Sequence, residues 1–417
     1  MSGDLRLYER WIVSPLLGLL DYMYYPMRWS MGRNRPKYFS EGWGDKDKLD
    51  AAHRAILEVF FQQRDEDGSP SHVNDLTWSD NTLAKLDVVC GTFTSPLAEY
   101  LPVGSKQCRV HRFTSPRESP SLCDPAASVQ EEVREERVLI FFPATGEEEA
   151  SSRIHLSKCV KNTMKDNVSF RFSSYILTAP FYGDRRPEGQ RQYFINNVSD
   201  YVVQSYALGT EAVALACHIS AEFEKKKKSR GEQTGKLDDA RLVFCFTGYS
   251  WGGSIAAASA IVAAHALRGK PDIAVTTAPY VGSATGAVIP SGIASSDVDW
   301  AAVGRSAEHH ASGDTITLGR AAARKKLWDY LDDISIKSFV ENHVTGAPVA
   351  AAVSSSTYSD HFVLPSYGKR LHDEVAHFTT LPATNARFRW LAGGHVWAYL
   401  RQESLLVPLI NEAFRLA

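Results

Sequence analysis

The chain has 417 residues, of which 44% are hydrophobic and 11% are aromatic. This composition excludes an intrinsically disordered protein and supplies enough apolar surface for a large core. The formal net charge is −2, so the chain lacks the basic excess by which proteins bind nucleic acid, and we expect no nucleic-acid partner.

An apolar, aromatic-rich segment opens the chain between residues 5 and 30. Its uncharged stretch, residues 11–20, contains Pro15 and is shorter than the roughly 20 apolar residues of a membrane-spanning helix. Two interpretations remain open. The segment is either a peripheral membrane contact, with its aromatic side chains at the depth of the lipid headgroups, or a helix docked on the protein's own core.

Strands that alternate with helices make up most of the remaining chain. Their spacing is typical of a mostly parallel sheet with helices on both faces. Residues 282–339 interrupt the alternation and are expected to form a helical cap, and residues 115–136 are expected to be irregular. The predicted strands are residues 87–93, 108–113, 138–142, 170–178, 241–247, 272–276, 348–354 and 387–391, and the main predicted helices are residues 47–63, 198–228, 253–264 and 366–378.

The most informative motif is Gly248-Tyr249-Ser250-Trp251-Gly252, between the strand 241–247 and the helix 253–264. A Gly-x-Ser-x-Gly sequence at a sharp strand-to-helix turn is the nucleophile elbow of α/β-hydrolases. Its glycines let the helix pack close to the strand, and the strained serine backbone lifts the hydroxyl clear of the sheet. We therefore expect Ser250 to be a nucleophile, with an ordinary Gly-rich turn as the alternative.

A serine hydroxyl needs a base to take its proton and a carboxylate to orient that base. In α/β-hydrolases these follow the serine in the order acid, histidine. His395 comes after a strand and a Gly-Gly pair, at the edge where such sheets present their chemistry. Asp360 ends the preceding strand and is the expected acid, whereas Asp373 falls inside a predicted helix and is the weaker candidate. The expected catalytic residues are Ser250, Asp360 and His395.

The oxyanion that develops during acyl transfer needs backbone N–H donors. One donor is normally the residue after the nucleophile, which is Trp251 here. The other is expected from the loop after the strand 138–142, where Thr145 and Gly146 lie. Gly146 permits a close approach of the backbone to a substrate.

Four further residues are expected to contact the substrate. Tyr249 lies beside the nucleophile, and Tyr182 follows the strand 170–178. Arg185 and Arg186 come shortly after Tyr182, and two adjacent guanidinium groups suit a phosphate. The alternative is that the two arginines pair with acidic residues and fix their own loop.

No metal ion or cofactor is expected from the sequence. The six cysteines show no Cys-x-x-Cys pair, and the chain has no His-Glu-x-x-His motif. Cys217 and Cys245 lie in apolar helix and strand patterns, where a thiol behaves as a small hydrophobic group. We therefore expect a reduced, intracellular compartment.

Other sequences spread over most of the chain accompany these motifs. They are Gly42-Trp-Gly44, Gly91-Thr-Phe-Thr-Ser-Pro-Leu-Ala-Glu-Tyr-Leu-Pro102, Ala144-Thr-Gly146, Pro180-Phe-Tyr-Gly-Asp-Arg-Arg-Pro187, Asn197-Val-Ser-Asp200 and Gly393-Gly-His395-Val-x-Ala-Tyr-Leu400. The combination resembles the alpha/beta hydrolase domain-containing protein 18 family. The resemblance implies Ser250 as nucleophile, Asp360 as acid and His395 as base. It also implies a mitochondrial association and a phospholipid acyl hydrolase, with cardiolipin as the suggested substrate.

The sequence thus predicts an α/β-hydrolase that cleaves an acyl ester of a membrane lipid through an acyl-enzyme intermediate. The expected parts are an N-terminal helical extension (1–85), a first part of the hydrolase domain (86–281), a cap (282–340) and a second part of the domain (341–417). An acyltransferase with the same triad, and a catalytically idle scaffold that binds lipid or protein, are the alternatives. The sequence predicts no oligomeric state.

Overall fold

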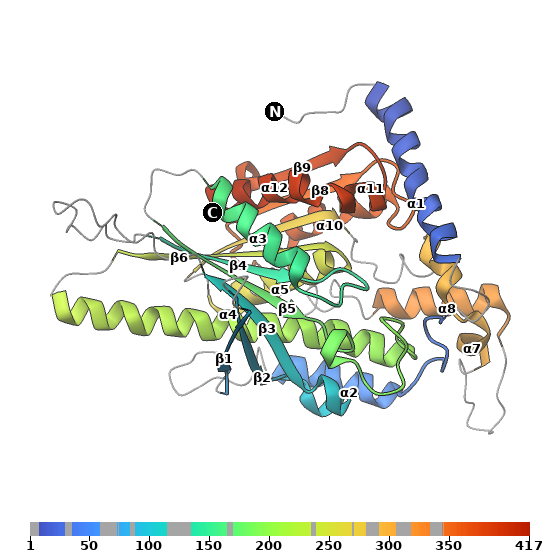
Figure 1. Ribbon diagram of the computed structural model, residues 1–417, viewed down its shortest axis with the longest axis horizontal. Helices are drawn as coiled ribbons and strands as arrows, with labels where there is room; N and C mark the ends of the chain where they lie inside the picture. The colour runs from blue at the N-terminus through green and yellow to red at the C-terminus, as the bar shows by residue number, and fades with distance from the viewer. Residues whose placement is uncertain are drawn as a thin grey trace.

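The computed structural model describes residues 8–29, 36–58, 73, 75–83, 88–114, 135–164, 170–234, 239–268, 271–280, 292–305, 318–333, 344 and 346–417. Within these residues, a nine-stranded sheet carries helices on both faces, in the arrangement of an α/β-hydrolase (Figure 1). The fold class predicted from the sequence is therefore confirmed.

The sheet is antiparallel at one side and parallel over the rest. Its strands are ordered β1-β2-β3-β5-β4-β6-β7-β8-β9, and all neighbours from β5 to β9 are parallel. The carboxyl ends of these parallel strands share one edge, so the loops that follow them meet there. The strands are β1 (Thr77–Leu83), β2 (Val88–Thr94), β3 (Gln107–Thr114), β4 (Glu135–Phe142), β5 (Phe170–Thr178), β6 (Arg241–Ser250), β7 (Asp272–Tyr280), β8 (Ala351–Thr357) and β9 (Ala386–Leu391).

Each face of the sheet has its own hydrophobic core. Along β4, Val138 and Ile140 point into the core that contains residues of α2, α4 and α5, whereas Leu139 and Phe141 point into the core that contains residues of α3 and α12. This alternation follows from the two-residue period of a strand. The α-helices are α1 (Ser14–Trp29), α2 (Lys46–Leu57), α3 (Ser151–Thr163), α4 (Val198–Thr234), α5 (Trp251–Ala266), α7 (Trp300–Arg305), α8 (Arg320–Asp333), α10 (Pro365–Phe378), α11 (His395–Leu400) and α12 (Gln402–Leu416).

The predicted elements are found with shifted ends. The strand expected over residues 170–178 is β5 itself, whereas α4 continues past the predicted end at residue 228 to Thr234. Of the expected cap, the described residues contain the short helix η6 (Ile293–Asp297), α7 and α8. Residues 282–291, 306–317 and 334–340 of that region, residues 115–134 of the expected irregular connection and residues 59–63 of the predicted helix 47–63 lie outside the described residues.

The N-terminal helix α1 docks on the hydrolase domain beside α11 (Figure 1). Its docked face consists of small and polar residues, because Ser14, Gly18 and Asp21 are buried. A Cβ on Gly18 would lie 2.7 Å from the Cβ of Ser359, which shows how closely the helix approaches the loop after β8. The docked interpretation of this segment therefore describes the structure, although the fully buried residues of the contact are small or polar and Leu17 is only half-buried beside Gly393.

The opposite face of α1 and of the preceding turn is apolar and exposed to solvent. Trp11 is 68% exposed and Leu16 is 62% exposed, and Tyr8, Ile12, Leu19 and Met23 are exposed as well. Tyr22 lies at the edge of the docked face, because its hydroxyl is 3.3 Å from His361 Nδ1. No helix among the described residues is long and apolar enough to cross a bilayer. Residues 5–7 and 30 of the predicted segment lie outside the described residues.

Candidate active site

The turn from β6 into α5 has the geometry of a nucleophile elbow. Ser250 has φ 55° and ψ −127°, a conformation that residues other than glycine rarely adopt. The flanking glycines are required by space. A Cβ on Gly248 would lie 2.2 Å from the carbonyl oxygen of Gly252, and a Cβ on Gly252 would lie 2.5 Å from the carbonyl oxygen of Pro143. The strained serine thus lies at the end of β6, beside the loop that follows β4.

Asp360 and His395 meet at the same edge of the sheet. Asp360 follows β8, His395 begins α11 after β9, and Asp360 Oδ2 lies 2.9 Å from His395 Nδ1. The Asp360 side chain is fully buried and also accepts hydrogen bonds from the backbone N–H groups of Phe362 and Val363 and from the hydroxyl of Thr357. Because the carboxylate holds Nδ1, Nε2 is the nitrogen left to act as a base.

Tyr249 links the elbow to the histidine loop. Its hydroxyl donates a hydrogen bond to the backbone carbonyl of His395 at 2.5 Å, and the two rings are 5.2 Å apart. Tyr249 is buried and braces the histidine loop. Its contact with substrate stays a prediction. Among the described contacts, no hydrogen bond joins the Ser250 hydroxyl to the His395 ring, a contact that often tightens only when substrate binds.

The charges around His395 favour its protonated form. Burial alone lowers the pKa of His395, but the charge and hydrogen bond of Asp360 and the charge of Asp21 outweigh burial, and the pKa is raised from 6.5. A stronger base takes the serine proton more readily, provided that the pH is high enough to keep it unprotonated. Asp373, the weaker candidate for the acid, instead forms an exposed ion pair with Lys369 on α10.

The loop after β4 is held by a carboxylate that the sequence analysis did not identify. Glu147 accepts a hydrogen bond from the backbone N–H of Ala144 at 2.9 Å and forms an ion pair with the buried Arg153 at 2.7 Å. Thr145 is exposed, and Gly146 has φ 79°, a value that favours glycine. The loop is therefore fixed next to the elbow, with the N–H of Ala144 already occupied. The oxyanion role of Thr145 and Gly146 stays a prediction.

Trp251 and Tyr182 are both buried beside the elbow. Trp251 is the first residue of α5, and its indole N–H donates to the hydroxyl of Ser205 at 3.2 Å. The Tyr182 ring lies 6.1 Å from the Trp251 ring, and its hydroxyl interacts with the backbone of Gly146. Tyr182 is 1% exposed and supports the loop after β4. Its contact with substrate stays a prediction. The backbone N–H of Trp251 stays a predicted oxyanion donor.

The two arginines of the loop after β5 pair with acidic residues. Both terminal nitrogens of Arg185 contact Glu211 of α4, at 2.8 and 2.7 Å, and they also donate to the carbonyls of Thr178 and Ser105. Arg186 forms an ion pair with Glu148. The predicted phosphate contact of Arg185 is therefore wrong, because its terminal nitrogens are used inside the protein. The alternative is that the two arginines pair with acidic residues and fix their own loop. Both Arg185 and Arg186 form such pairs.

A second buried carboxylate reaches the site from the N-terminal helix. Asp21 of α1 accepts hydrogen bonds from the backbone N–H groups of His361, His395 and Val396. The sequence analysis placed Asp21 in an apolar segment and assigned it no role. The contact spans 374 positions in the sequence, so no local pattern identifies it.

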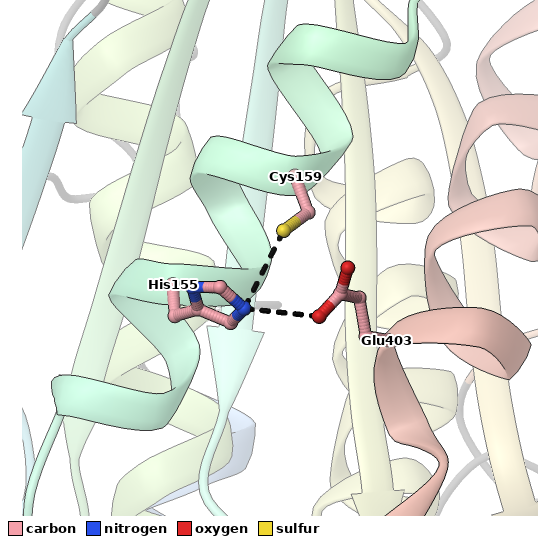
Figure 2. Close-up of side chains that lie close together, drawn as sticks. All are labelled: His155, Cys159 and Glu403. Carbon is pink, nitrogen blue, oxygen red and sulfur yellow. Dashed lines mark hydrogen bonds and ion pairs between the residues drawn. The ribbon is translucent and has the colours of Figure 1, made fainter.

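One cluster of potential metal ligands is found within the described residues, and it does not include the residues above. His155 and Cys159 of α3 face Glu403 of α12 (Figure 2). The Nε2 atom of His155 lies 3.0 Å from Glu403 Oε2 and 3.6 Å from the Cys159 sulfur. The cysteines that the structure describes form no disulfide.

Comparison with known proteins identifies the family of the chain. The family model for alpha/beta hydrolase domain containing 18 matches residues 36–416. The chain belongs to this family. Its matched region contains Ser250, Asp360 and His395, whereas α1 and its Asp21 lie before it. No curated protein matches the chain by sequence.

Solved structures with a similar course of the chain share little sequence with it. An acetyl xylan esterase from Paenibacillus sp. R4 is 9% identical, with a TM-score of 0.44, over 89% of this chain and 96% of that one. A putative hydrolase from Legionella pneumophila is 12% identical, with a TM-score of 0.42, over 88% and 95%. Carboxyl esterase 2 from Tuber melanosporum is 12% identical, with a TM-score of 0.37, over 89% and 98%.

Proposed function

We propose that this protein is a serine hydrolase that cleaves an acyl ester. The observation that carries the proposal is the contact of 2.9 Å between Asp360 and His395 at the sheet edge where Ser250 is held strained. His395 Nε2 takes the proton as Ser250 Oγ attacks the acyl carbon, and the imidazolium then protonates the leaving alcohol as the ester C–O bond breaks. Water, activated by the same nitrogen, hydrolyses the acyl-enzyme.

The N-terminal helix supports a membrane lipid as the source of the ester. The exposed face of α1 and its preceding turn presents Trp11 together with the aliphatic Ile12, Leu16 and Leu19, a combination that suits the lipid headgroup region. The helix packs on α11, which begins with His395 and ends with the exposed Leu400. A bilayer surface that received this apolar face would lie close to the triad. A phospholipid is therefore the proposed substrate class, and cardiolipin is the species that the family resemblance implies.

The proposal is tested with vesicles and with a short soluble ester. Trp11→Ser combined with Leu16→Ser should weaken binding to cardiolipin-containing vesicles and slow phospholipid hydrolysis, while hydrolysis of the soluble ester stays near the wild-type rate. Val103→Ser is the matched control, because Val103 is 85% exposed and lies outside the helix. Equal vesicle binding by the double variant and the wild type would contradict the membrane contact. If the double variant instead differs from the wild type in oligomeric state, the apolar face binds a second copy of the chain.

Products distinguish hydrolysis from acyl transfer. With phospholipid as the acyl donor, we expect free fatty acid, whereas transfer of the acyl chain to an added alcohol or lysolipid would indicate an acyltransferase. The mitochondrial association implied by the family resemblance belongs to the same proposal and is checked by cell fractionation. Activity that survives in both Ser250→Ala and His395→Ala would contradict the proposed mechanism.

A further inference from the structure

The carboxylate of Asp21 joins the two loops that carry the acid and the base. Its Oδ2 accepts from the N–H groups of His361 and His395, each at 3.0 Å, and its Oδ1 accepts from the N–H of Val396 at 2.8 Å. His361 directly follows Asp360. We propose that Asp21 is a positioning residue that holds these loops together so that Asp360 and His395 meet. This inference rests on the proposed function of the triad.

The surroundings of Asp21 are shaped to admit it. A Cβ on Gly394 would lie 2.6 Å from Asp21 Oδ2, so the first residue before His395 has to be glycine for the carboxylate to fit. Ser14, earlier on the same docked face, accepts from the N–H of Gly393 at 3.0 Å and contacts the hydroxyl of Ser359 at 2.9 Å. Ser14 thus anchors the same helix to the same loops without a charge, which makes it a matched control.

The charged and titratable groups near His395 are few among the described residues. Asp360 after β8 and Asp21 on α1 act on its ring through their charges, and the N–H of His361 binds Asp21. The hydroxyl of Tyr249 donates to its carbonyl, and the Tyr399 ring lies 5.4 Å from the Tyr249 ring. Arg153 acts on Tyr249 through its charge. Burial and the charge of Asp360 raise the pKa of Asp21 above 3.8 despite its three backbone hydrogen bonds.

The test compares the pH dependence of kcat/KM for Asp21→Asn and Ser14→Ala, with a soluble ester and rates normalised to the number of reactive serines. Asp21→Asn should lower kcat/KM by about 10- to 100-fold near neutral pH, because hydrogen bonds to a charged group are lost. A plot of kcat/KM against pH falls at low pH, where the imidazole becomes protonated, and this fall is the acid limb of the profile. Asp21→Asn should also move the acid limb to lower pH, because a negative charge beside the imidazole is lost. Ser14→Ala loosens the helix but should leave the acid limb in place.

Two outcomes would overturn the role of Asp21. One is a wild-type acid limb and kcat/KM in Asp21→Asn, and the other is an equal shift of the limb in Ser14→Ala. Gly394→Ala is the second variant, because the added Cβ displaces the carboxylate and should reproduce the loss if Asp21→Asn does not fold. Activity that does not depend on Ser250 would instead contradict the proposed function, so the two failures are distinguishable.

The cluster on α3 and α12 carries a second, independent inference (Figure 2). The geometry points to a site for a divalent metal ion of zinc-like preference formed by His155, Cys159 and Glu403. The donor atoms all lie within 4.8 Å of one another, with separations of 3.0 Å and 3.6 Å from the histidine nitrogen. Bonds of about 2.0–2.3 Å in a tetrahedral zinc site separate ligand atoms by roughly 3.3–3.6 Å, which is close to these values.

The placement of these side chains suits such a site. His155 and Cys159 are one helical turn apart, so both point from the same face of α3 toward α12. Binding of the ion to Cys159 breaks the S–H bond, forms a metal–sulfur bond and releases the proton to water. Cys159 and Glu403 also line a cleft of about 670 Å³, through which the ion reaches the site.

Cobalt and zinc ions alone are the probes for this site. One equivalent of Co²⁺ should give a thiolate-to-metal absorption band that added Zn²⁺ removes, and Cys159→Ser should abolish the band. His155→Ala and Glu403→Gln should weaken Zn²⁺ binding measured by calorimetry. Cys90→Ser is the control, because Cys90 also lies beside a histidine, 3.2 Å from His111 Nδ1, but outside this cluster. Absence of the band in the wild type, or its persistence in Cys159→Ser, would overturn the inference.

Discussion

Asp360 Oδ2 lies 2.9 Å from His395 Nδ1, and the two residues are 35 positions apart in the sequence. The contact forms because β8 and β9 are neighbouring parallel strands, which end at the same edge of the sheet. It orients the imidazole and, together with the charge of Asp21, raises the pKa of His395 against the opposing effect of burial. The first two predictions follow from this pair.

Hydrolysis should depend on pH through the base. Because the pKa of His395 is raised above 6.5, kcat/KM for a soluble ester should fall as the pH is lowered through a value above 6.5. The sign follows from the chemistry, since only the unprotonated imidazole takes the serine proton. A pH profile of the wild-type protein checks this, and an acid limb at or below 6.5 would contradict it.

Asp360→Asn should lose most of the activity but not all of it. The amide presents an N–H group to Nδ1 and so disturbs the tautomer and orientation of the imidazole, which costs kcat on the order of 10⁴-fold. Asp373→Asn is the matched control, because Asp373 is in an exposed ion pair with Lys369 and should keep full activity. Steady-state kinetics compares the two variants, and similar rates would remove Asp360 from the mechanism.

Gly252→Ala should destabilise the elbow through a clash with the backbone. The added Cβ would lie 2.5 Å from the carbonyl oxygen of Pro143, and such overpacking typically costs about 1–3 kcal/mol. Gly319→Ala is the control, because its Cβ would meet nothing within 4 Å. Denaturant unfolding measures both. A Gly252→Ala protein as stable as the control would show that the elbow has room to relax.

Glu211→Ala should lower the free energy of unfolding by about 3–5 kcal/mol, because it leaves the buried guanidinium of Arg185 without its partner. Asp184→Ala removes the partner of Arg109 in a pair whose side chains are 48% and 46% exposed, and it should cost at most about 1 kcal/mol. Thermal and denaturant unfolding compare the two variants. Equal stability losses would contradict the structural role of Arg185.

The parts of the site that are encoded locally were predictable from the sequence. Ser250 is recognisable because the glycines required by its turn lie two positions before it and two positions after it, between a strand and a helix. Asp360 and His395 are recognisable because each follows a strand of the parallel sheet, in the expected order.

Contacts made across the fold left no such pattern. Arg185 lies in a loop that suits a phosphate, but its partner Glu211 is placed beside it only when α4 packs against the sheet. The apolar composition of α1 left a membrane contact and docking on the core equally open. The helix docks through Ser14 and Asp21 and exposes Trp11. Because docking depends on hydrogen bonds to loops more than 300 positions away, hydropathy does not reveal it.

Because α1 docks on the histidine loop, removal of residues 1–30 should affect hydrolysis as well as membrane binding. The sequence interpretation of a membrane contact expects removal of residues 1–30 to spare hydrolysis of a soluble ester. In the structure this deletion removes Ser14 and Asp21 from the histidine loop. We therefore expect the truncated protein to lose activity toward a soluble ester as well, so substitutions on the exposed face isolate the membrane contact better.

Covalent labelling by a fluorophosphonate probe tests the central claim most directly. Such probes react with a serine hydroxyl that an adjacent base has activated, so they report the nucleophile without knowledge of the natural substrate. The account predicts one adduct per chain, located by peptide mass spectrometry on Ser250, and greatly slowed labelling in His395→Ala. Folded protein that remains unlabelled, or an adduct on a different serine, would contradict the assignment of Ser250, Asp360 and His395.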